Sequence, residues 1–503
     1  MSSPNGLVCF TNCLLPQEDG KLVEKDLWID EQRGVILDAQ RTFYERKERP
    51  GKIVDLCGNI LSPGLIDIQI NGAYGFDFSV YEDDQAYQNG LKNVAEKIVE
   101  TGVTALVPTL ITQERSSYPK LLRHLHPQRG EKSAHLLGWH IEGPFLQMAK
   151  RGAHNPTLVI SAAGGLKAFE EIYGSENMGF TEDWLMSDSS ETGRVGVRII
   201  TAAPEVEGVL DAVYELTKRG IIYSIGHSNA PTDVASSAMA HGARLITHLF
   251  NAMPQLHHRD PSIIGLLGAS PHLSSYFSPV SSPTASTPKS TFRRSLSLKS
   301  KSILPGIFNG SGKESKKSLK ATSEAFDDSD SPPLSPRSLL YQAATMARTP
   351  VATLDRPFYE LIVDGIHSHP NSVRLAYNAH PEGCILITDA MKILDPNLKD
   401  GVHEWRDGKR FVKEGIKLYL EGTTTLAGSV VTLDTCVRNF VKFTGCSLGE
   451  AIKCATFNPA RCLGIEHRKG TLRPGADADF TVFDKNGDVL STWIKGKAVW
   501  NCS

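Results

Sequence analysis

The stretch Leu136-Leu-Gly-Trp-His-Ile-Glu142 is a short apolar run that stops on a carboxylate. Three further runs share this design, 221–227, 244–248 and 384–389, and they stop on His227, His248 and Asp389. In a barrel of parallel strands and helices, the carboxyl ends of the strands converge on one bowl, where the chemistry takes place. The four runs therefore predict an α/β fold, a (β/α)8 TIM-like barrel, with an open metal site and a separate group for proton transfer.

Strand-like runs follow one another through the middle of the chain, and helical patterns separate them, for example at 89–101 and 231–241. Such an alternation closes into a parallel barrel. We expect the eight strands, in order, at 65–70, 103–109, 136–142, 197–202, 221–227, 244–248, 359–364 and 384–389.

Both ends of the chain have the pattern of β-structure. The first sixty residues contain short runs of alternating apolar and polar residues broken by turns, and the closing segment, 466–503, has the same pattern. We therefore predict a small β-sandwich domain built from the two termini, which would meet in space. The predicted limits are 1–62 and 466–503 for the sandwich, 63–270 and 351–465 for the catalytic barrel, and 271–350 for an insertion.

The composition is that of a globular protein without a strong field of either charge. Hydrophobic residues make up 40% of the 503 residues, charged residues 22%, and the formal net charge is -2. This balance argues against nucleic acid or an anionic membrane as a partner. The cysteines have no CxxC spacing, and neither a secretion signal nor a spanning apolar stretch is evident, so we expect free thiols in a cytoplasmic protein.

Residues 271–340 break the pattern of the barrel, because serine accounts for 19 of these 70 residues and basic residues cluster before acidic ones. Such a composition cannot bury enough apolar surface to offset its chain entropy, so we predict a disordered insertion after the sixth strand, on the catalytic face. A tolerated loop expansion is the interpretation we favour. The alternative is regulation by kinases, at the basophilic pattern of Ser295 and Ser297 and at the Ser-Pro pairs of Ser331 and Ser335.

Each of the four strand-end residues has an ordinary structural explanation when it is taken alone. A histidine is at least as often a hydrogen-bonded structural residue as a metal ligand, and an aspartate can cap a turn. Three donors at the ends of strands three, five and six would, however, all meet around one point. Asp389 follows a nearly apolar run and needs a partner or a task, and opposite a metal it is a natural general base.

These residues also lie in motifs that resemble a known family. The sequence is similar to the N-acetylglucosamine-6-phosphate deacetylases of the amidohydrolase superfamily, apart from the Ser-rich insertion and a stretch around 174–193. The motifs, in the order of the family, are His140-Ile-Glu142-Gly-Pro144, Arg151-Gly-Ala-His154-Asn155-Pro156, Gly226-His227-Ser228, Thr247-His248-Leu-Phe-Asn251-Ala252-Met253, His257-His258-Arg259-Asp260, Asp364-Gly365-Ile-His367 and Thr388-Asp389-Ala-Met391.

The resemblance implies a role for each matching residue. Glu142, His227 and His248 would hold one divalent cation, expected to be zinc, and Asp389 would accept and return the proton. His154 would orient and polarise the acetamido carbonyl of a phosphorylated amino sugar, N-acetylglucosamine 6-phosphate, which would yield acetate and glucosamine 6-phosphate. The other implied contacts are Ala153, Asn251 and Ala252 in the sugar site, Arg259 and His367 at the 6-phosphate, and Leu426, Ala427 and Gly428 near the acetyl group.

The expected number of metal ions follows from residues that are absent. Many amidohydrolases carry His-x-His at the end of strand one and a bridging lysine at strand four, whereas this chain has Gln69-Ile-Asn71 and Thr201-Ala-Ala-Pro204 there. We therefore expect one ion per subunit, although a Glu-His-His set accepts several first-row metals. The family also suggests a homodimer. Two alternatives stay open: an amidohydrolase that acts on a cyclic amide, and a non-catalytic scaffold with the same fold.

Overall fold

The computed structural model describes residues 2–124, 131–179, 196–269 and 356–502, apart from 397, 406–407, 424–425 and 427. The described residues belong to one compact unit, Met1–Tyr276 together with Leu354–Ser503. The predicted disordered insertion, with its four candidate phosphorylation sites, lies outside the described residues, and so does Ala427. The limits predicted for the individual domains stay predictions.

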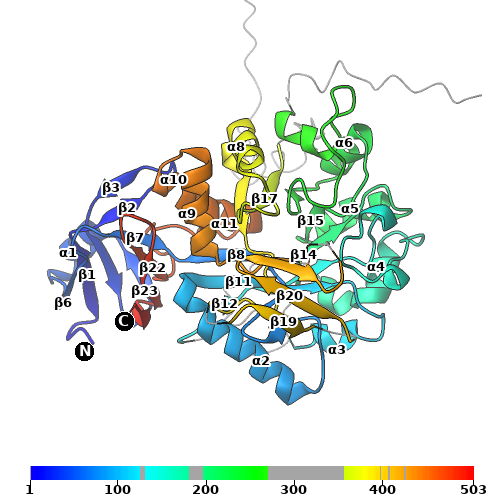
Figure 1. The fold of residues 1–503 in the computed structure, drawn as a ribbon. Coiled ribbons are helices and arrows are strands. Elements are labelled where there is room, and N and C mark those ends of the chain that lie inside the picture. Colours follow the sequence, from blue (N-terminus) through cyan, green and yellow to red (C-terminus); the bar gives the residue numbers. More distant parts are fainter. Residues whose placement is uncertain are drawn as a thin grey trace, which may run out of the picture. The chain divides into compact units, whose positions relative to one another are not determined.

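Eight parallel strands form a barrel within this unit (Figure 1). All eight occur in the predicted order, and each pairs with the next along the chain, so the predicted (β/α)8 barrel is confirmed. A short additional strand, β12 (His135–Leu136), pairs with β11. The barrel strands are β8 (Leu65–Ile70), β11 (Val103–Ile111), β13 (Trp139–Glu142), β14 (Val197–Ala202), β15 (Ile222–Ile225), β16 (Leu245–Ile246), β17 (Phe358–Ile362) and β18 (Cys384–Ile387).

The barrel closes where its last strand meets its first. Main-chain hydrogen bonds join the two, from Asp389 N to Gln69 O (2.9 Å) and from Asn71 N to Ala390 O (2.8 Å). Beneath them, the Thr388 hydroxyl donates to the buried carboxylate of Asp67 (2.6 Å). We call this junction of β8 and β18 the barrel seam. It brings the predicted proton-transfer residue beside the end of strand one.

Helices surround the strands because each has one apolar face to bury. In α5 (Val209–Lys218) the buried residues Val209, Ala212, Val213 and Leu216 recur at helical spacing. Among the described residues, no helix is both long and apolar enough to cross a bilayer. The other helices are α2 (Asp84–Lys97), α3 (Tyr118–Leu122), α4 (Leu166–Tyr173), α6 (Thr232–Ala240), α8 (Pro370–Ala379), α9 (Leu433–Thr444), α10 (Leu448–Ala455) and α11 (Phe457–Leu463), with 3-10 turns at Ile98–Thr101, Met148–Lys150, Pro156–Leu158, Ser175–Met178, Ile263–Gly268 and Pro381–Gly383.

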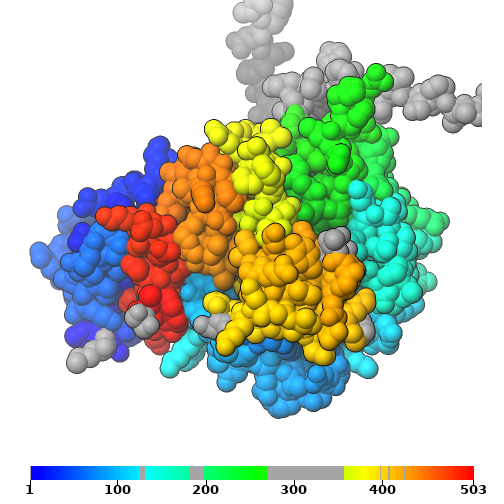
Figure 2. All heavy atoms as spheres, viewed as in Figure 1, coloured from blue at the N-terminus to red at the C-terminus, as the bar shows by residue number. Residues whose placement is uncertain are grey.

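Two further sheets lie outside the barrel: the first is built from N-terminal strands alone, and the second combines both ends of the chain, as predicted. One has the order β5-β4-β1-β6, and the other has the order β24-β23-β22-β7-β2-β3, in which β7 pairs antiparallel with β22. Figure 2 shows the first and last segments, blue and red, side by side. The strands are β1 (Leu7–Thr11), β2 (Leu14–Pro16), β3 (Leu22–Glu24), β4 (Leu27–Asp30), β5 (Val35–Leu37), β6 (Lys52–Asp55), β7 (Ile60–Pro63), β22 (Phe480–Phe483), β23 (Val489–Ile494) and β24 (Lys497–Asn501).

The structure contains elements that the sequence analysis missed. The first sixty residues include a helix, α1 (Ala39–Arg46), capped by Asp38, whose side chain accepts from Arg41 N (2.9 Å). Only Thr42 of this helix is buried, so it lacks the apolar face by which a helix is recognised. Short strands β9 (Gly72–Ala73) and β10 (Phe76–Asp77) and a three-stranded sheet of β19 (Gly401–Glu404), β20 (Arg410–Glu414) and β21 (Lys417–Leu420) were also unexpected.

The residues that flank the Ser-rich segment lie away from the catalytic face. Arg356 stands two residues before β17 begins, and its guanidinium donates to Leu267 O (3.4 Å) and Ala379 O (2.8 Å). Both flanks therefore meet at the amino-terminal end of β17, whereas the chemistry of such a barrel lies at the carboxyl ends. The prediction that the segment itself lies on the catalytic face concerns residues outside those that the structure describes.

The aromatic core of the sandwich gives a first prediction. Phe10 of β1 is fully buried and meets Phe480 and Trp493 edge-to-face, with ring centroids 5.6 and 5.1 Å apart. Replacing Phe10 by Ala should lower the free energy of unfolding by about 3–5 kcal/mol, because it leaves a cavity between the two ends of the chain. Chemical denaturation measures this loss. Ile53→Ala is the control, since Ile53 is 70% exposed in the same sheet, and an equal loss there would contradict the account.

Candidate metal and catalytic centre

Three ligand atoms converge at the carboxyl end of the barrel. The Nε2 atoms of His227 and His248 lie 3.0 and 3.1 Å from Glu142 Oε1 and 3.1 Å from each other. Tetrahedral ligands held 2.0–2.1 Å from a zinc ion lie roughly 3.3 Å apart. All three residues are buried, so the predicted ligands do meet around one point.

The protonation of these groups favours a cation between them. His227 Nδ1 donates to Lys150 O (2.7 Å), and this bond leaves the lone pair of a neutral imidazole on Nε2, which faces the cluster. Burial opposes ionisation of Glu142, but hydrogen bonds to His227 and His248 outweigh it and hold the pKa of that carboxyl well below its usual range. Against the effect of burial, the hydrogen bond to Glu142 and its charge raise the pKa of His248 to about 9. The ionised carboxylate thus needs a positive charge beside it, which can be a proton on an imidazole or a metal ion, and the buried Glu-His-His donor set fits a divalent metal ion.

The backbone turns sharply at the strand ends to direct these side chains inward. His227, His248 and Asp389 have φ angles of 48°, 28° and 47°, a region that costs a residue other than glycine about 1–3 kcal/mol. Neighbouring groups hold these conformations. The main-chain N–H of His248, for example, donates to Glu360 Oε2 (3.2 Å), a buried carboxyl of β17 whose pKa burial raises well above its usual range.

Asp389 lies beside the cluster at the barrel seam. Its Oδ1 atom accepts from the side-chain amides of Asn71 (2.7 Å) and Gln69 (3.4 Å). Burial, together with the charge of Glu142, raises the pKa of Asp389 to about 6. A carboxylate with a pKa near the working pH is suited to accept a proton and to return it.

Two further histidines face the same space and are each oriented by a neighbour. His154 Nδ1 accepts from the amide of Thr112 (3.4 Å) and also contacts its hydroxyl (2.8 Å), so Nε2 faces the cluster, 3.8 Å from Glu142 Oε2. His367 Nδ1 lies 2.6 Å from Asp364 Oδ2. In both rings one nitrogen is thus held by a neighbouring residue.

A cavity of about 210 Å³ joins these groups. It brings together the three candidate ligands, Asp389 and most of the predicted substrate contacts. Arg259 does not line it, and its side chain is exposed to solvent. The predicted residues on its wall are Ala153, His154, Asn251, Ala252, His367, Leu426 and Gly428.

Other wall residues were not expected from the sequence. Trp405 reaches the cavity from the loop between β19 and β20 and stacks on Phe411, with centroids 4.6 Å apart. The alternating pattern of 401–420 was the available signal for this sheet. Asn71 also lines the cavity, whereas the sequence analysis considered it only as a missing metal ligand.

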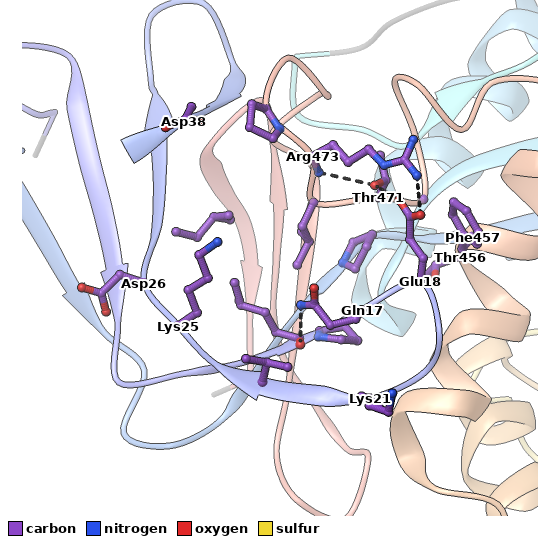
Figure 3. A pocket seen from close by; sticks show the side chains of 18 of the residues that line it. Gln17, Glu18, Lys21, Lys25, Asp26, Asp38, Thr456, Phe457, Thr471 and Arg473 are labelled. Atoms are coloured by element: carbon purple, nitrogen blue, oxygen red, sulfur yellow. Dashed lines mark hydrogen bonds and ion pairs between the residues drawn. The ribbon is translucent and has the colours of Figure 1, made fainter. Parts of the chain in front are cut away.

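Two other features do not carry this chemistry. Lys469 occupies a second acidic cluster, where its ammonium contacts His135 Nδ1 (2.5 Å), Asp477 (2.9 Å) and Asp479, so the positive charge is already supplied. A larger cavity of about 820 Å³ lies at the sandwich and next to α10 and α11 (Figure 3). No histidine or cysteine is among the described residues that line it, and its Glu18 and Arg473 pair with each other.

Comparison with known proteins agrees with this geometry. The chain is 36% identical to the N-acetylglucosamine-6-phosphate deacetylase of Danio rerio over 98% of this chain and 96% of the relative. The human enzyme of that name is 34% identical over 98% and 95%. The chain belongs to the N-acetylglucosamine-6-phosphate deacetylase family. A model of the amidohydrolase family also matches residues 310–499.

Solved structures of the family share the fold. The deacetylase of Pasteurella multocida superposes with a TM-score of 0.67 at 22% identity, over 98% of this chain and 99% of the other. A mutant of the Mycobacterium smegmatis deacetylase, solved in complex with N-acetyl-D-glucosamine-6-phosphate, gives 0.65 at 22% identity, over 99% and 100%. At this identity the similarity concerns the fold of barrel and sheet domain alone.

The converging atoms predict how metal is held. His248→Ala should lower the metal content to well under half of the wild-type value, because two ligands remain where three converge. Elemental analysis after exhaustive dialysis measures this. His257→Ala, at an exposed histidine outside the cavity, should keep the wild-type content. Equal contents in the two variants would refute the assignment.

Proposed function

We propose that the protein hydrolyses the acetamide of N-acetyl-D-glucosamine 6-phosphate to acetate and D-glucosamine 6-phosphate. The observation that carries the proposal is the convergence of Glu142, His227 and His248 beside Asp389 in one cavity. Relatives with the deacetylase name, at 34–36% identity over nearly their whole length, supply the substrate class. The complete set of groups argues against a non-catalytic scaffold.

Glu142, His227 and His248 would hold one divalent cation per subunit, and zinc suits this set of nitrogen and oxygen donors. When bound, the ion supplies a Lewis acid that activates water and polarises the amide carbonyl. A second ion is not expected, because Gln69 and Asn71 direct amide N–H groups at the carboxylates. These donors make a cyclic-amide hydrolase of the two-metal kind the weaker alternative.

The chain's own groups would then move the proton and orient the substrate. Asp389 takes a proton from the attacking water and returns it to the amine as the C–N bond breaks. His154 donates from Nε2 to the acetyl oxygen and stabilises its developing charge. Ala153, Leu426 and Gly428 line the cavity with small or apolar surface, which suits an acetyl methyl and a sugar ring.

His367 is the proposed partner of the 6-phosphate, since Asp364 holds its Nδ1 and orients the ring at the cavity wall. Arg259 as a second phosphate ligand stays a prediction, because its side chain does not reach the cavity of its own chain. Homodimer formation, a cytoplasmic location and the kinase sites within 271–340 are also retained as predictions from the sequence alone.

The division of roles predicts the behaviour of Asp389→Asn. This variant should keep the wild-type content of metal, because Asp389 is not one of the converging ligands. Its kcat for acetate release should fall by about 100-fold or more, because proton transfer is lost. Metal analysis and an acetate-release assay on the same sample measure the metal content and kcat of the variant. Near wild-type turnover in a metal-loaded variant would contradict the role.

The phosphate assignment predicts a difference between two substrates. His367→Gln should raise KM for N-acetylglucosamine 6-phosphate by about 10-fold or more, the value of a hydrogen bond to a charged group. Hydrolysis of N-acetylglucosamine, which has no phosphate for His367 to bind, should be unchanged. Equal effects on both sugars would show that His367 does not recognise the phosphate.

A further inference from the structure

Two polar residues of strand β8 and the residue that follows its end point into the barrel at alternate positions. One residue separates Asp67 from Gln69 and Gln69 from Asn71, and a strand directs every second side chain to the same face. All three are buried, with Gln69 completely excluded from solvent. They lie along the barrel seam, opposite the turn that carries Asp389. Burial of so many polar groups is costly unless they have partners.

The two amides bind the catalytic carboxylates directly. Asn71 Nδ2 donates to Asp389 Oδ1 (2.7 Å). Gln69 Nε2 lies 3.4 Å from the same oxygen and 3.2 Å from Glu142 Oε1. The side-chain NH2 of Gln69 has two hydrogens, so it can serve one carboxylate with each. Gln69 is therefore a bridge between a candidate metal ligand and the candidate base.

These donors distinguish the two oxygens of Asp389. Oδ1 receives both amides, whereas no hydrogen bond to Oδ2 is made by the residues that the structure describes. Main-chain bonds on either side, Asp389 N to Gln69 O (2.9 Å) and Asn71 N to Ala390 O (2.8 Å), fix the position of the turn. The side chain of Asp389 is thus held at Oδ1, and Oδ2 remains available to a bound molecule.

We propose that Asn71 and Gln69 are positioning residues that occupy Oδ1 of Asp389, so that Oδ2 is the atom that accepts and returns the proton. Gln69 in addition couples the orientation of Asp389 to that of Glu142. The inference deepens the proposed function and rests on it. Asn71 and Gln69 act through Asp389 and Glu142 and have no part in bond breaking themselves.

The contacts predict different defects for the two amides. Among the described residues, the side-chain amide of Asn71 donates to Asp389 and to no metal ligand, so its loss should disturb proton transfer and leave the metal ligands alone. Gln69 touches both carboxylates, so its loss should weaken metal retention as well. Partners that orient metal ligands typically contribute about 10–100-fold in metal affinity or activity. A merely structural role would lower stability without this division.

The test compares Asn71→Leu and Gln69→Met, which remove the donors at similar volume, with wild-type enzyme. Asn71→Leu should lower kcat by about 10-fold or more, change KM less than about twofold, and lose zinc to a chelator at the wild-type concentration. Gln69→Met should lower kcat and also lose zinc at a chelator concentration lower by about 10-fold. The inference is overturned if Asn71→Leu keeps its kcat, or if both variants lose zinc alike.

A matched control and a second variant complete the experiment. Asn458 is a fully buried amide that donates to Cys384 O (2.7 Å) at the opposite end of β18, and Asn458→Leu should lower the melting temperature while the folded fraction keeps the wild-type kcat. If Asn71→Leu does not fold, Asn71→Asp keeps the shape of the side chain and replaces its donor by an acceptor, and the same loss of kcat is expected. Wild-type kcat in Asn71→Asp would overturn the inference. Failure of the wild-type protein to release acetate would instead overturn the proposed function.

Discussion

Glu142 Oε1, His227 Nε2 and His248 Nε2 lie 3.0–3.1 Å from one another, although they come from three different strands. This contact exists only because a closed parallel barrel brings the ends of its strands to one place. An ionised carboxylate buried at this place needs a positive charge beside it, and the three groups together can act as the ligands of a cation. The fold and the metal are therefore linked through one small triangle of atoms.

The barrel seam also stabilises two neighbouring carboxylates. Asp389 and Glu142 are both buried carboxyl groups near one another, and the charge of one disfavours the ionisation of the other. The side-chain amides of Gln69 and Asn71, at the end of β8, meet the two carboxylates where the barrel closes. The same junction thus closes the barrel and holds the turn at Asp389 in a left-handed conformation. It also distinguishes Oδ1 of Asp389, which accepts the two amides, from Oδ2.

The sequence predicts the parts of this arrangement that depend on local pattern. Apolar runs that stop on Glu142, His227, His248 and Asp389 place these residues at strand ends, and parallel strands bring those ends together. Other parts depend on contacts between distant segments. The sequence analysis noted Gln69 and Asn71 only because they replace the metal ligands of other amidohydrolases. Their amide bonds to Asp389 span more than 300 residues and leave no local pattern. Trp405 was missed for the same reason, since nothing local reveals which end of the barrel a loop reaches.

The central claim is that Glu142, His227 and His248 bind one metal ion while Asp389 stays free to move a proton. A crystal structure with anomalous diffraction measured at the zinc edge tests it most directly. The account predicts one peak per chain, about 2.0–2.2 Å from Glu142 Oε1 and from the two Nε2 atoms, with Asp389 Oδ1 still bound to Asn71. Two peaks in the cavity, or a single peak coordinated by Asp389 in place of Glu142, would contradict it.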